Sequence, residues 1–271
     1  MPAGAETGGA RRALVAALRA EPERTAILTD VDGTLAPIVE RPEQAAVPGR
    51  ARELLEVLAA RFALVGCISG RRAADARLLV GVGGIAYAGN HGFELLLPGE
   101  DEPRLDPAIA GREREASDFL ASLDGADLEA VGLRGEDKGP IQALHWRGAA
   151  DERAADARAH EIAAQAGRAG LEPRWGRKVL ELRPVGGGGK DAAVGALLAE
   201  EDLGAVAYAG DDRTDLDACR RLRELREEGR LQTAVCVGVL SPEAPPEMSE
   251  EADLLVDGVD GWLELLAELA E

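Results

Sequence analysis

The sequence has 271 residues, of which 46% are hydrophobic and 30% charged, and its 31 Lys and Arg residues against 50 Asp and Glu residues give a formal net charge of -19. This length allows one large domain, or a core that carries a smaller inserted domain. The negative charge repels nucleic acid and anionic lipid surfaces, and no apolar run is long enough to span a bilayer, so we expect neither nucleic acid nor a membrane as a partner. The N-terminus lacks the long apolar core of a signal peptide, which makes the cytoplasm the expected location.

Three cysteines are spread along the chain: Cys67, Cys219 and Cys236. They are too few and too scattered for a disulfide framework or a thiolate metal site. Each is therefore predicted to be a small buried side chain.

Short apolar segments recur along the chain, and helical patterns separate them. The segments predict strands, buried on both faces of a sheet, at 26–30, 62–68, 84–89, 205–210, 233–239 and 253–256. Leu and Ala at helical spacing predict helices between them, as at 48–62 and 213–229, and an amphipathic helix that packs on the sheet at 261–271. Strands that alternate with helices indicate an α/β fold with a doubly wound, Rossmann-like parallel sheet.

The middle of the chain departs from this alternation. Between residues 107 and 184 the expected order is a helix at 108–123, two strands around the turn EDKGP, a helix at 151–167 and a strand pair near Trp175 and 178–182. This order predicts a small α+β domain, 107–184, inserted into a core formed by 1–106 and 185–271. The flanking segments LLLPGEDEPRLDP and RPVGGGG are rich enough in Pro and Gly to serve as connections or hinges.

Polar residues stand at the carboxyl ends of the predicted core strands, where ligands gather in parallel α/β sheets. They are Asp30 and Asp32; Ser69, Gly70 and Arg71; Asn90 and His91; and Asp211, Asp212 and Asp215, with Lys190 at the start of the helix before the last of these strands. Carboxylates clustered without His or Cys favour a hard cation with oxygen ligands, such as Mg²⁺ bound by Asp30 and Asp211. Such a cation would let a carboxylate approach a phosphate dianion, whose oxygens Lys190 and Ser69 would bind.

Asp30 and Asp32 lie two residues apart at the end of one strand, so both can face the same bound group. They need not do the same work. One carboxylate can attack phosphorus to form an aspartyl-phosphate, while the other protonates the leaving oxygen and then activates water.

The motifs DVDGT, SGR, Lys190 and GDDRTD follow one another in the order found in the haloacid dehalogenase superfamily of phosphohydrolases, which the chain resembles. The resemblance implies that Asp30 is the nucleophile and Asp32 the general acid and base. It also implies Mg²⁺ held by the Asp30 carboxylate, the Asp32 main-chain carbonyl and Asp211, with support from Asp212 and Asp215. The inserted domain resembles the α+β cap of the sugar-phosphatase branch, which closes over substrate.

Four segments, GNHGFE, EDKGPIQALHWR, GRKVLELRP and GDDRTDLDA, resemble the trehalose-6-phosphate phosphatase family more closely, and the resemblance covers most of residues 24–260. It implies a sugar-phosphate substrate, trehalose and inorganic phosphate as products, and substrate contacts from Ser69, Gly70, Arg71, Asn90 and His91. In the cap it implies sugar-binding roles for Lys138, His145, Arg147, Lys178, Glu181 and Arg183. Strand alternation places His145 with Arg147, and Glu181 with Arg183, on common faces, whereas Lys178 falls on the opposite face.

Two further expectations follow from the resemblance. The length leaves no room for a glycosyltransferase domain, so we expect a stand-alone, monomeric phosphatase. The family commonly carries Gly after the lysine of the third motif, where this chain has Asp191; a carboxylate there favours the helix dipole and leaves Lys190 in place.

Several alternatives stay open. The same core serves phosphatases of other sugar phosphates, such as sucrose phosphate or mannosyl-3-phosphoglycerate, and aspartates with a hydroxyl and a lysine also occur in phospho-accepting regulatory modules, which are about half this length and lack a cap. GGGGK lacks the first Gly and the final Ser or Thr of a nucleotide-binding loop. His91 could be a turn residue, Arg71 and Arg213 could pair with nearby acids, and Trp146 and Trp175 are expected in the cap core.

Overall fold

The structure is a computed structural model that describes residues 4–39, 44–176, 178–199, 201–242 and 244–271. The chain divides into two compact units, one formed by Met1–Arg104 with Gly188–Glu271 and the other by Leu105–Gly187. The inserted domain expected from the sequence was 107–184. The role of the smaller unit as a cap stays a prediction.

Within the described residues, the larger unit contains an eight-stranded sheet of order β12-β11-β10-β1-β2-β3-β4-β5. Its strands are β1 (Thr25–Thr29), β2 (Leu64–Ile68), β3 (Ala86–Gly89), β4 (Glu94–Leu96), β5 (Arg104–Leu105), β10 (Ala205–Gly210), β11 (Thr233–Leu240) and β12 (Leu254–Asp257). All neighbours from β12 to β3 pair in parallel, which confirms the doubly wound parallel core. The segment 95–107 was expected to serve as a connection, and this was wrong for its first residues: β4 pairs antiparallel with β3 and extends the sheet.

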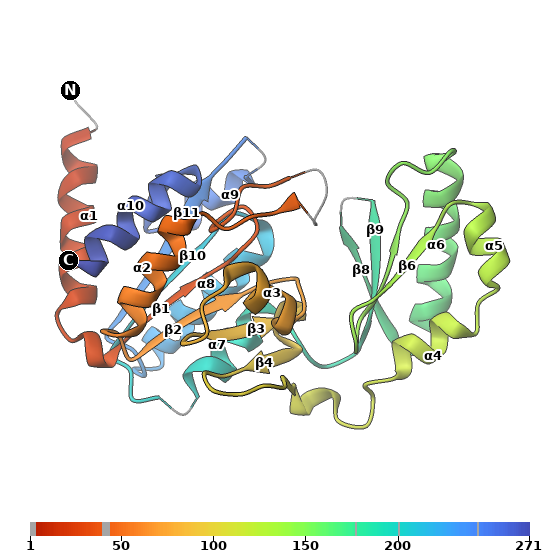
Figure 1. The fold of residues 1–271 in the computed structure, drawn as a ribbon, viewed down its shortest axis with the longest axis horizontal. Helices are drawn as coiled ribbons and strands as arrows, with labels where there is room; N and C mark the ends of the chain where they lie inside the picture. Colours follow the sequence, from red (N-terminus) through yellow and green to blue (C-terminus); the bar gives the residue numbers. More distant parts are fainter. Residues whose placement is uncertain (1–3, 40–43, 177, 200, 243) are drawn as a thin grey trace. The chain divides into compact units, whose positions relative to one another are not determined.

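Helices cover both faces of this sheet (Figure 1). Alternate strand residues face opposite layers, because successive side chains of a strand point to opposite sides; Ile27 packs in one apolar cluster and Leu28 in the other. One layer contains α1 (Gly4–Arg19), α2 (Gly49–Ala59), α3 (Ala73–Val80) and α10 (Gly258–Ala270), and the other α7 (Lys190–Leu198) and α8 (Arg213–Glu227), with the short α9 (Pro246–Glu251) beside β11. The predicted terminal amphipathic helix is α10, with Trp262 and Leu266 fully buried.

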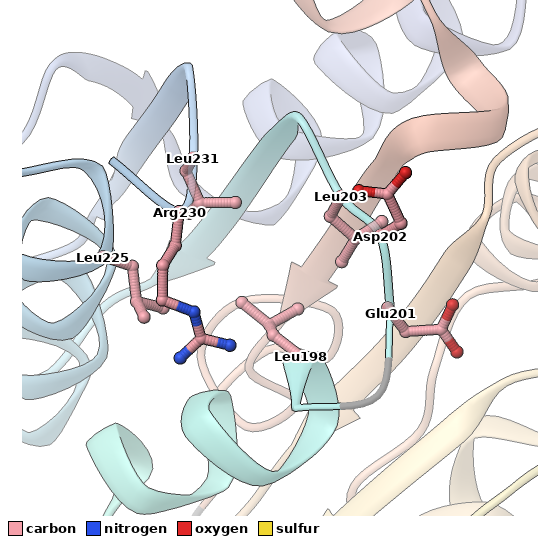
Figure 2. A pocket seen from close by; sticks show the side chains of 7 residues that line it. All are labelled: Leu198, Glu201, Asp202, Leu203, Leu225, Arg230 and Leu231. Atoms are coloured by element: carbon pink, nitrogen blue, oxygen red, sulfur yellow. The ribbon is translucent and has the colours of Figure 1, made fainter. Parts of the chain in front are cut away.

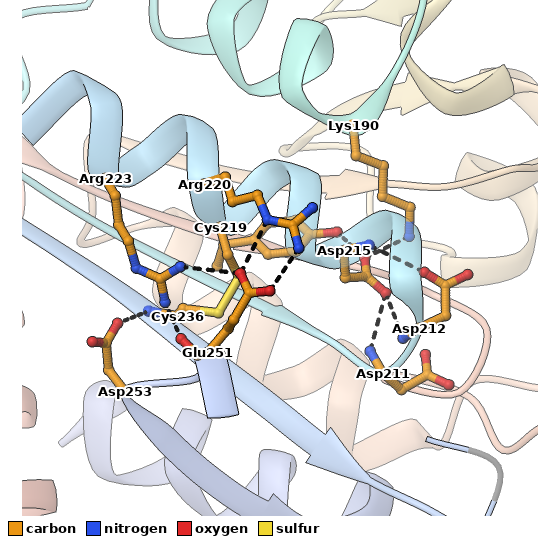
Figure 3. Close-up of a disulfide and its surroundings, with 11 residues drawn as sticks. Lys190, Asp211, Asp212, Asp215, Cys219, Arg220, Arg223, Cys236, Glu251 and Asp253 are labelled. Carbon is orange, nitrogen blue, oxygen red and sulfur yellow. Dashed lines mark hydrogen bonds and ion pairs between the residues drawn. A yellow bond between two sulfur atoms is a disulfide. The ribbon is translucent and has the colours of Figure 1, made fainter. Parts of the chain in front are cut away.

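Cys219 of α8 and Cys236 of β11 form a disulfide, with their Cα atoms 5.4 Å apart (Figure 3). The prediction that every cysteine is an unlinked buried side chain was wrong for these two, whereas Cys67 is buried and free. Composition and spacing could not reveal the pair, because only the packing of α8 against β11 brings the two Cα atoms within bonding range. The link ties α8 to the sheet.

The smaller unit is an antiparallel sheet of order β6-β7-β9-β8 with helices packed against it. Its elements are α4 (Glu115–Ala121), α5 (Gly125–Ala130), β6 (Arg134–Asp137), β7 (Gln142–His145), α6 (Glu152–Arg168), β8 (Leu171–Gly176) and β9 (Val179–Pro184). The helix expected at 108–123 is shorter, because Gly111 adopts a left-handed conformation (φ 78°) before α4, and α5 was not expected. Trp146 is in the core of the unit, but Trp175 is 46% exposed and stacks on His160, so its predicted burial was wrong.

A pocket of about 230 Å³ lies near the start of β10, lined by Leu198, Glu201, Asp202, Leu203, Leu225, Arg230 and Leu231 (Figure 2). Asp211 follows the other end of this strand, and none of the predicted catalytic residues lines the pocket. In the described parts of the chain, no helix has the length and apolarity needed to cross a membrane.

Candidate active site

Asp30 and Asp211 follow β1 and β10, which are neighbours in the core sheet. β1 and β10 pair in parallel with Thr29 opposite Ala209, and the Asp30 N–H donates to the Ala209 carbonyl at 2.8 Å. The carboxyl ends of the two strands therefore place both aspartates at one edge, and their residues are only 5% exposed. Gly33 follows with φ 96°; a Cβ there would lie 2.2 Å from Asp211 Oδ2, so this turn requires glycine.

Lys190 reaches the same place from the start of α7. Its Nζ lies 2.7 Å from Asp30 Oδ1 and 2.5 Å from Asp215 Oδ1, and the residue is 3% exposed. The preceding Gly188 and Gly189 both have positive φ, and the Gly189 N–H donates to the His91 carbonyl, which fixes where the helix begins. A residue 160 positions away in sequence thus contacts Asp30 directly.

Asp212 and Asp215 organise the start of α8. Asp212 Oδ1 accepts from the N–H groups of Thr214 and Asp215, as an N-cap residue does. Asp215 Oδ2 accepts from the N–H groups of Asp211 and Asp212 at 3.0 and 2.9 Å (Figure 3). Asp215 therefore holds the backbone of the segment that carries Asp211.

The electrostatics of the cluster favour a bound cation. Burial raises the pKa of Asp30 well above its usual range, and the nearby carboxylates add to the rise while Lys190 opposes it. Burial and the carboxylates of Asp215 and Asp212 likewise raise the pKa of Asp211 to about 7. Burial alone would lower the pKa of Lys190, but Asp215 and Asp30 stabilise its ammonium and raise the pKa well above its usual range.

The donor set fits a divalent metal ion with oxygen ligands. One carboxylate oxygen from each of Asp30, Asp211 and Asp215 lies within 4.8 Å of the others. Both Asp215 oxygens already accept two hydrogen bonds each, whereas Thr34 Oγ1 donates to Asp211 Oδ1 at 3.2 Å. Asp30 and Asp211 are therefore better suited than Asp215 to bind a hard cation directly.

Asp32 and Ser69 lie beside Arg71. The guanidinium donates to both carboxylate oxygens of Asp32, each at 2.7 Å, and the Arg71 N–H donates to Ser69 Oγ at 3.2 Å. Ser69 is buried at the end of β2, followed by Gly70. Arg213, in contrast, makes an exposed pair with Glu247.

Asn90 and His91 form a strained turn after β3. Both have positive φ, 50° and 55°, and the His91 N–H donates to the Ser69 carbonyl at 2.9 Å. A Cβ on Gly70 would lie 2.7 Å from His91 Nε2, so the imidazole packs directly on Gly70. The turn thus packs against both Ser69 and Gly70. Non-glycine residues with left-handed backbone, such as Asn90 and His91, are concentrated at functional sites.

Polar residues gather on the side of the small sheet that faces away from its apolar core. Glu181 accepts hydrogen bonds from Lys138 Nζ at 3.0 Å and Arg183 Nε at 3.1 Å. His145 Nε2 lies 2.7 Å from Glu136 Oε2, and Arg147 is exposed just beyond β7. Lys178 was expected on the opposite face of a strand, but it lies in the turn before β9 with φ 61° and pairs with Glu152 at the start of α6. Arg177 of the same sequence motif lies outside the described residues.

Tyr208 contacts this site and was missed by the sequence analysis. Its hydroxyl donates to Asp215 Oδ1, and the residue is fully buried in β10. The available signal was one phenol within the otherwise small and apolar strand AVAYAG, since a buried tyrosine hydroxyl usually requires a partner.

Known proteins are similar in sequence to much of this chain. A model of the family described as trehalose-phosphatase matches residues 28–244. A Mycobacterium avium protein named trehalose-phosphate phosphatase is 34% identical over 262 residues, covering 86% of this chain and 63% of that protein. A Mycobacterium tuberculosis protein named an uncharacterized glycosyl hydrolase is 39% identical over 207 residues, covering 74% of this chain and 15% of that protein. The chain thus spans less than two thirds of the length of these relatives.

Solved structures share the fold. The C-terminal domain of a C. albicans trehalose-6-phosphate phosphatase matches with a TM-score of 0.72 and 22% identity, covering 96% of each chain. A haloacid dehalogenase-like hydrolase from Bacteroides thetaiotaomicron matches with a TM-score of 0.59 and 16% identity, covering 90% of this chain and 99% of the other. At these identities the likeness establishes the fold alone.

Proposed function

The chain belongs to the trehalose-phosphatase family, and on this premise we propose that it hydrolyses trehalose 6-phosphate to trehalose and inorganic phosphate. Membership in this family confirms the resemblance that the sequence motifs indicated. The observation that carries the proposal is the contact of Lys190 with Asp30 at 2.7 Å, beside Asp211, at the carboxyl edge of the core sheet. A nucleophile, a cation for phosphoryl oxygens and a metal-binding carboxylate can there act on one phosphoryl group.

Asp30 is the proposed nucleophile. One of its oxygens bonds to phosphorus as the bond from phosphorus to the sugar oxygen breaks, and the departing oxygen takes a proton from Asp32. Water then gives a proton to Asp32 and attacks phosphorus, which releases inorganic phosphate and restores Asp30. Ser69 and Lys190 bind the phosphoryl oxygens. In the structure Arg71 donates to both oxygens of the Asp32 carboxylate, so Asp32 must take up a proton and loosen this pair before it can act as the acid. The Arg71 guanidinium would then be able to contact the phosphate.

Mg²⁺ is the proposed cofactor. The Asp30 and Asp211 carboxylates and the Asp32 main-chain carbonyl would hold it, with support from Asp212 and Asp215. When bound, it would offset the negative charge of the carboxylates and of the phosphate. The geometry supports this proposal, because one carboxylate oxygen from each of Asp30, Asp211 and Asp215 lies within 4.8 Å of the others.

Selectivity for the sugar is proposed to come from the smaller unit. Lys138, Glu181 and Arg183 form a network of ion pairs on the polar side of its sheet, with side chains only 11 to 16% exposed. Such preordered charged groups suit the recognition of sugar hydroxyls, because little side-chain freedom is lost on binding. His145 ends β7 on the same side of the sheet and Arg147 lies just beyond that strand, whereas the pairing of Lys178 with Glu152 supports no sugar contact.

A panel of sugar phosphates tests reaction, metal and substrate together. With Mg²⁺, phosphate release is expected to be fastest from trehalose 6-phosphate, and a chelator is expected to abolish it on every substrate. Sucrose phosphate, mannosyl-3-phosphoglycerate and an aryl phosphate complete the panel. Faster release from another sugar phosphate would reassign the substrate while leaving the chemistry intact, whereas no release from any of them would refute the enzyme proposal.

Glu181→Ala is expected to lower kcat/KM for trehalose 6-phosphate roughly tenfold or more, because a hydrogen bond to a charged group contributes about 1.5–3 kcal/mol. Hydrolysis of the aryl phosphate should change less than twofold. Glu161→Ala, which removes an exposed carboxylate from α6, serves as the control. An equal loss on both substrates would contradict sugar recognition by Glu181.

A further inference from the structure

Tyr208 lies in the middle of β10, with its side chain in the apolar cluster formed with α7 and α8. Its hydroxyl donates to Asp215 Oδ1, the same oxygen that accepts a hydrogen bond from Lys190 Nζ. Lys190 in turn donates to Asp30 Oδ1. A continuous chain of hydrogen bonds therefore joins the phenol to the proposed nucleophile.

The Asp215 carboxylate is held on every side. Its Oδ2 accepts the N–H groups of Asp211 and Asp212, and a Cβ on Gly210 would lie 2.1 Å from its Cγ, so it packs directly on the backbone. The Lys190 ammonium divides its contacts between Asp215 and Asp30. How it divides them depends on how much negative charge Oδ1 of Asp215 presents.

The phenol reduces that charge, because a hydrogen bond to a carboxylate oxygen stabilises part of its negative charge. Without the phenol, Asp215 Oδ1 would attract Lys190 more strongly in this dry environment, and the ammonium would shift away from Asp30 and the phosphoryl oxygens. We propose that Tyr208 is a positioning residue for the phosphatase reaction, whose hydroxyl keeps Lys190 shared between Asp215 and Asp30. The inference rests on the proposed function of the site.

The sequence contains a matched control, since its two tyrosines are Tyr208 and Tyr87. Tyr87 is also fully buried, and its hydroxyl donates to the Val82 carbonyl at 2.5 Å, in the opposite apolar layer of the core. Replacing either tyrosine by Phe removes one buried hydroxyl and little volume. The Cys219–Cys236 link and the strand pair of Tyr208 with Cys236 help to hold β10, β11 and α8 together in the Tyr208 variant.

The experiment measures kcat, KM and the unfolding temperature of wild type, Tyr208→Phe and Tyr87→Phe with Mg²⁺ and p-nitrophenyl phosphate. Tyr208→Phe is expected to lower kcat about tenfold with KM within twofold of wild type, which corresponds to about 1.4 kcal/mol in the barrier. Tyr87→Phe is expected to keep kcat within twofold. Both variants should stay folded and lose some thermal stability, with the larger loss in Tyr208→Phe because its hydroxyl bonds a charged group.

Three results would overturn the proposal: an unchanged kcat in Tyr208→Phe, equal losses of kcat in the two variants, or a Tyr208→Phe protein that does not fold while Tyr87→Phe does. The last two would make the hydroxyl a purely structural group. The aryl substrate separates this inference from the sugar assignment, because a failure of trehalose 6-phosphate as substrate would leave the comparison readable. A wild type inactive on all phosphates would refute the proposed function itself.

Discussion

Asp30→Asn is expected to reduce phosphate release on the order of 10⁴-fold or more, as removal of a catalytic nucleophile does. The amide keeps the shape of the side chain but cannot attack phosphorus to form an aspartyl-phosphate. The fold should survive, because burial already opposes the charged form of Asp30 and raises its pKa, and because Lys190 keeps its 2.5 Å contact with Asp215. Phosphate release under saturating Mg²⁺ and the unfolding temperature measure both effects.

Asp202→Asn is the matched control, since it removes a carboxylate whose side chain is 92% exposed and lies outside the candidate active site. It should behave as wild type. Turnover by Asp30→Asn within tenfold of wild type would exclude Asp30 as the nucleophile. Loss of the folded state in Asp30→Asn would show that its carboxylate is needed for stability.

Lys190→Met is expected to lower kcat by roughly 10² to 10³-fold, the range observed when a preorganised donor to a developing negative charge is removed. It should also destabilise the metal-free protein, by about 3–5 kcal/mol, because Asp30 and Asp215 lose their buried cationic partner. Mg²⁺ would restore part of the missing positive charge. The rise in unfolding temperature on adding Mg²⁺ should therefore be larger for Lys190→Met than for wild type.

Arg220→Met provides the control for this second effect. Arg220 pairs with Glu251 and Asp217 at the surface, where ion pairs contribute only about 0–1 kcal/mol. Its response to Mg²⁺ should equal that of wild type. An equal Mg²⁺ response in Lys190→Met would contradict a metal site beside this lysine.

The central strands and the residues at their carboxyl ends could be predicted from the sequence, because their signals are local. Short apolar runs followed by Asp, Ser or Gly indicate buried strands that end at a ligand edge, and the structure has β1, β2 and β10 at these positions. The sequence also predicted that Lys190 lies in the same crevice as Asp30. Their roles in the reaction stay a prediction.

The features that sequence could not reveal depend on tertiary packing. The Tyr208 contact with Asp215 requires the start of α8 to turn back over β10. The sequence left open that Arg71 pairs with a nearby acid, but that this acid is Asp32 depends on β1 and β2 ending side by side. The disulfide depends in the same way on α8 lying against β11. The antiparallel strand β4 was hidden in a segment whose Pro and acidic residues favoured a loop.

The position of β1 between β2 and β10 has a consequence for synthesis on the ribosome. β1 is translated early, whereas β10, which covers one edge of β1, emerges only after the whole of Leu105–Gly187. Until then the nascent chain carries an unpaired apolar strand, which is a template for aggregation with other chains. The yield during expression therefore depends on how long this edge of β1 stays unpaired. Chaperones that bind the edge should matter more for this chain than for proteins whose neighbouring strands are synthesised one after the other.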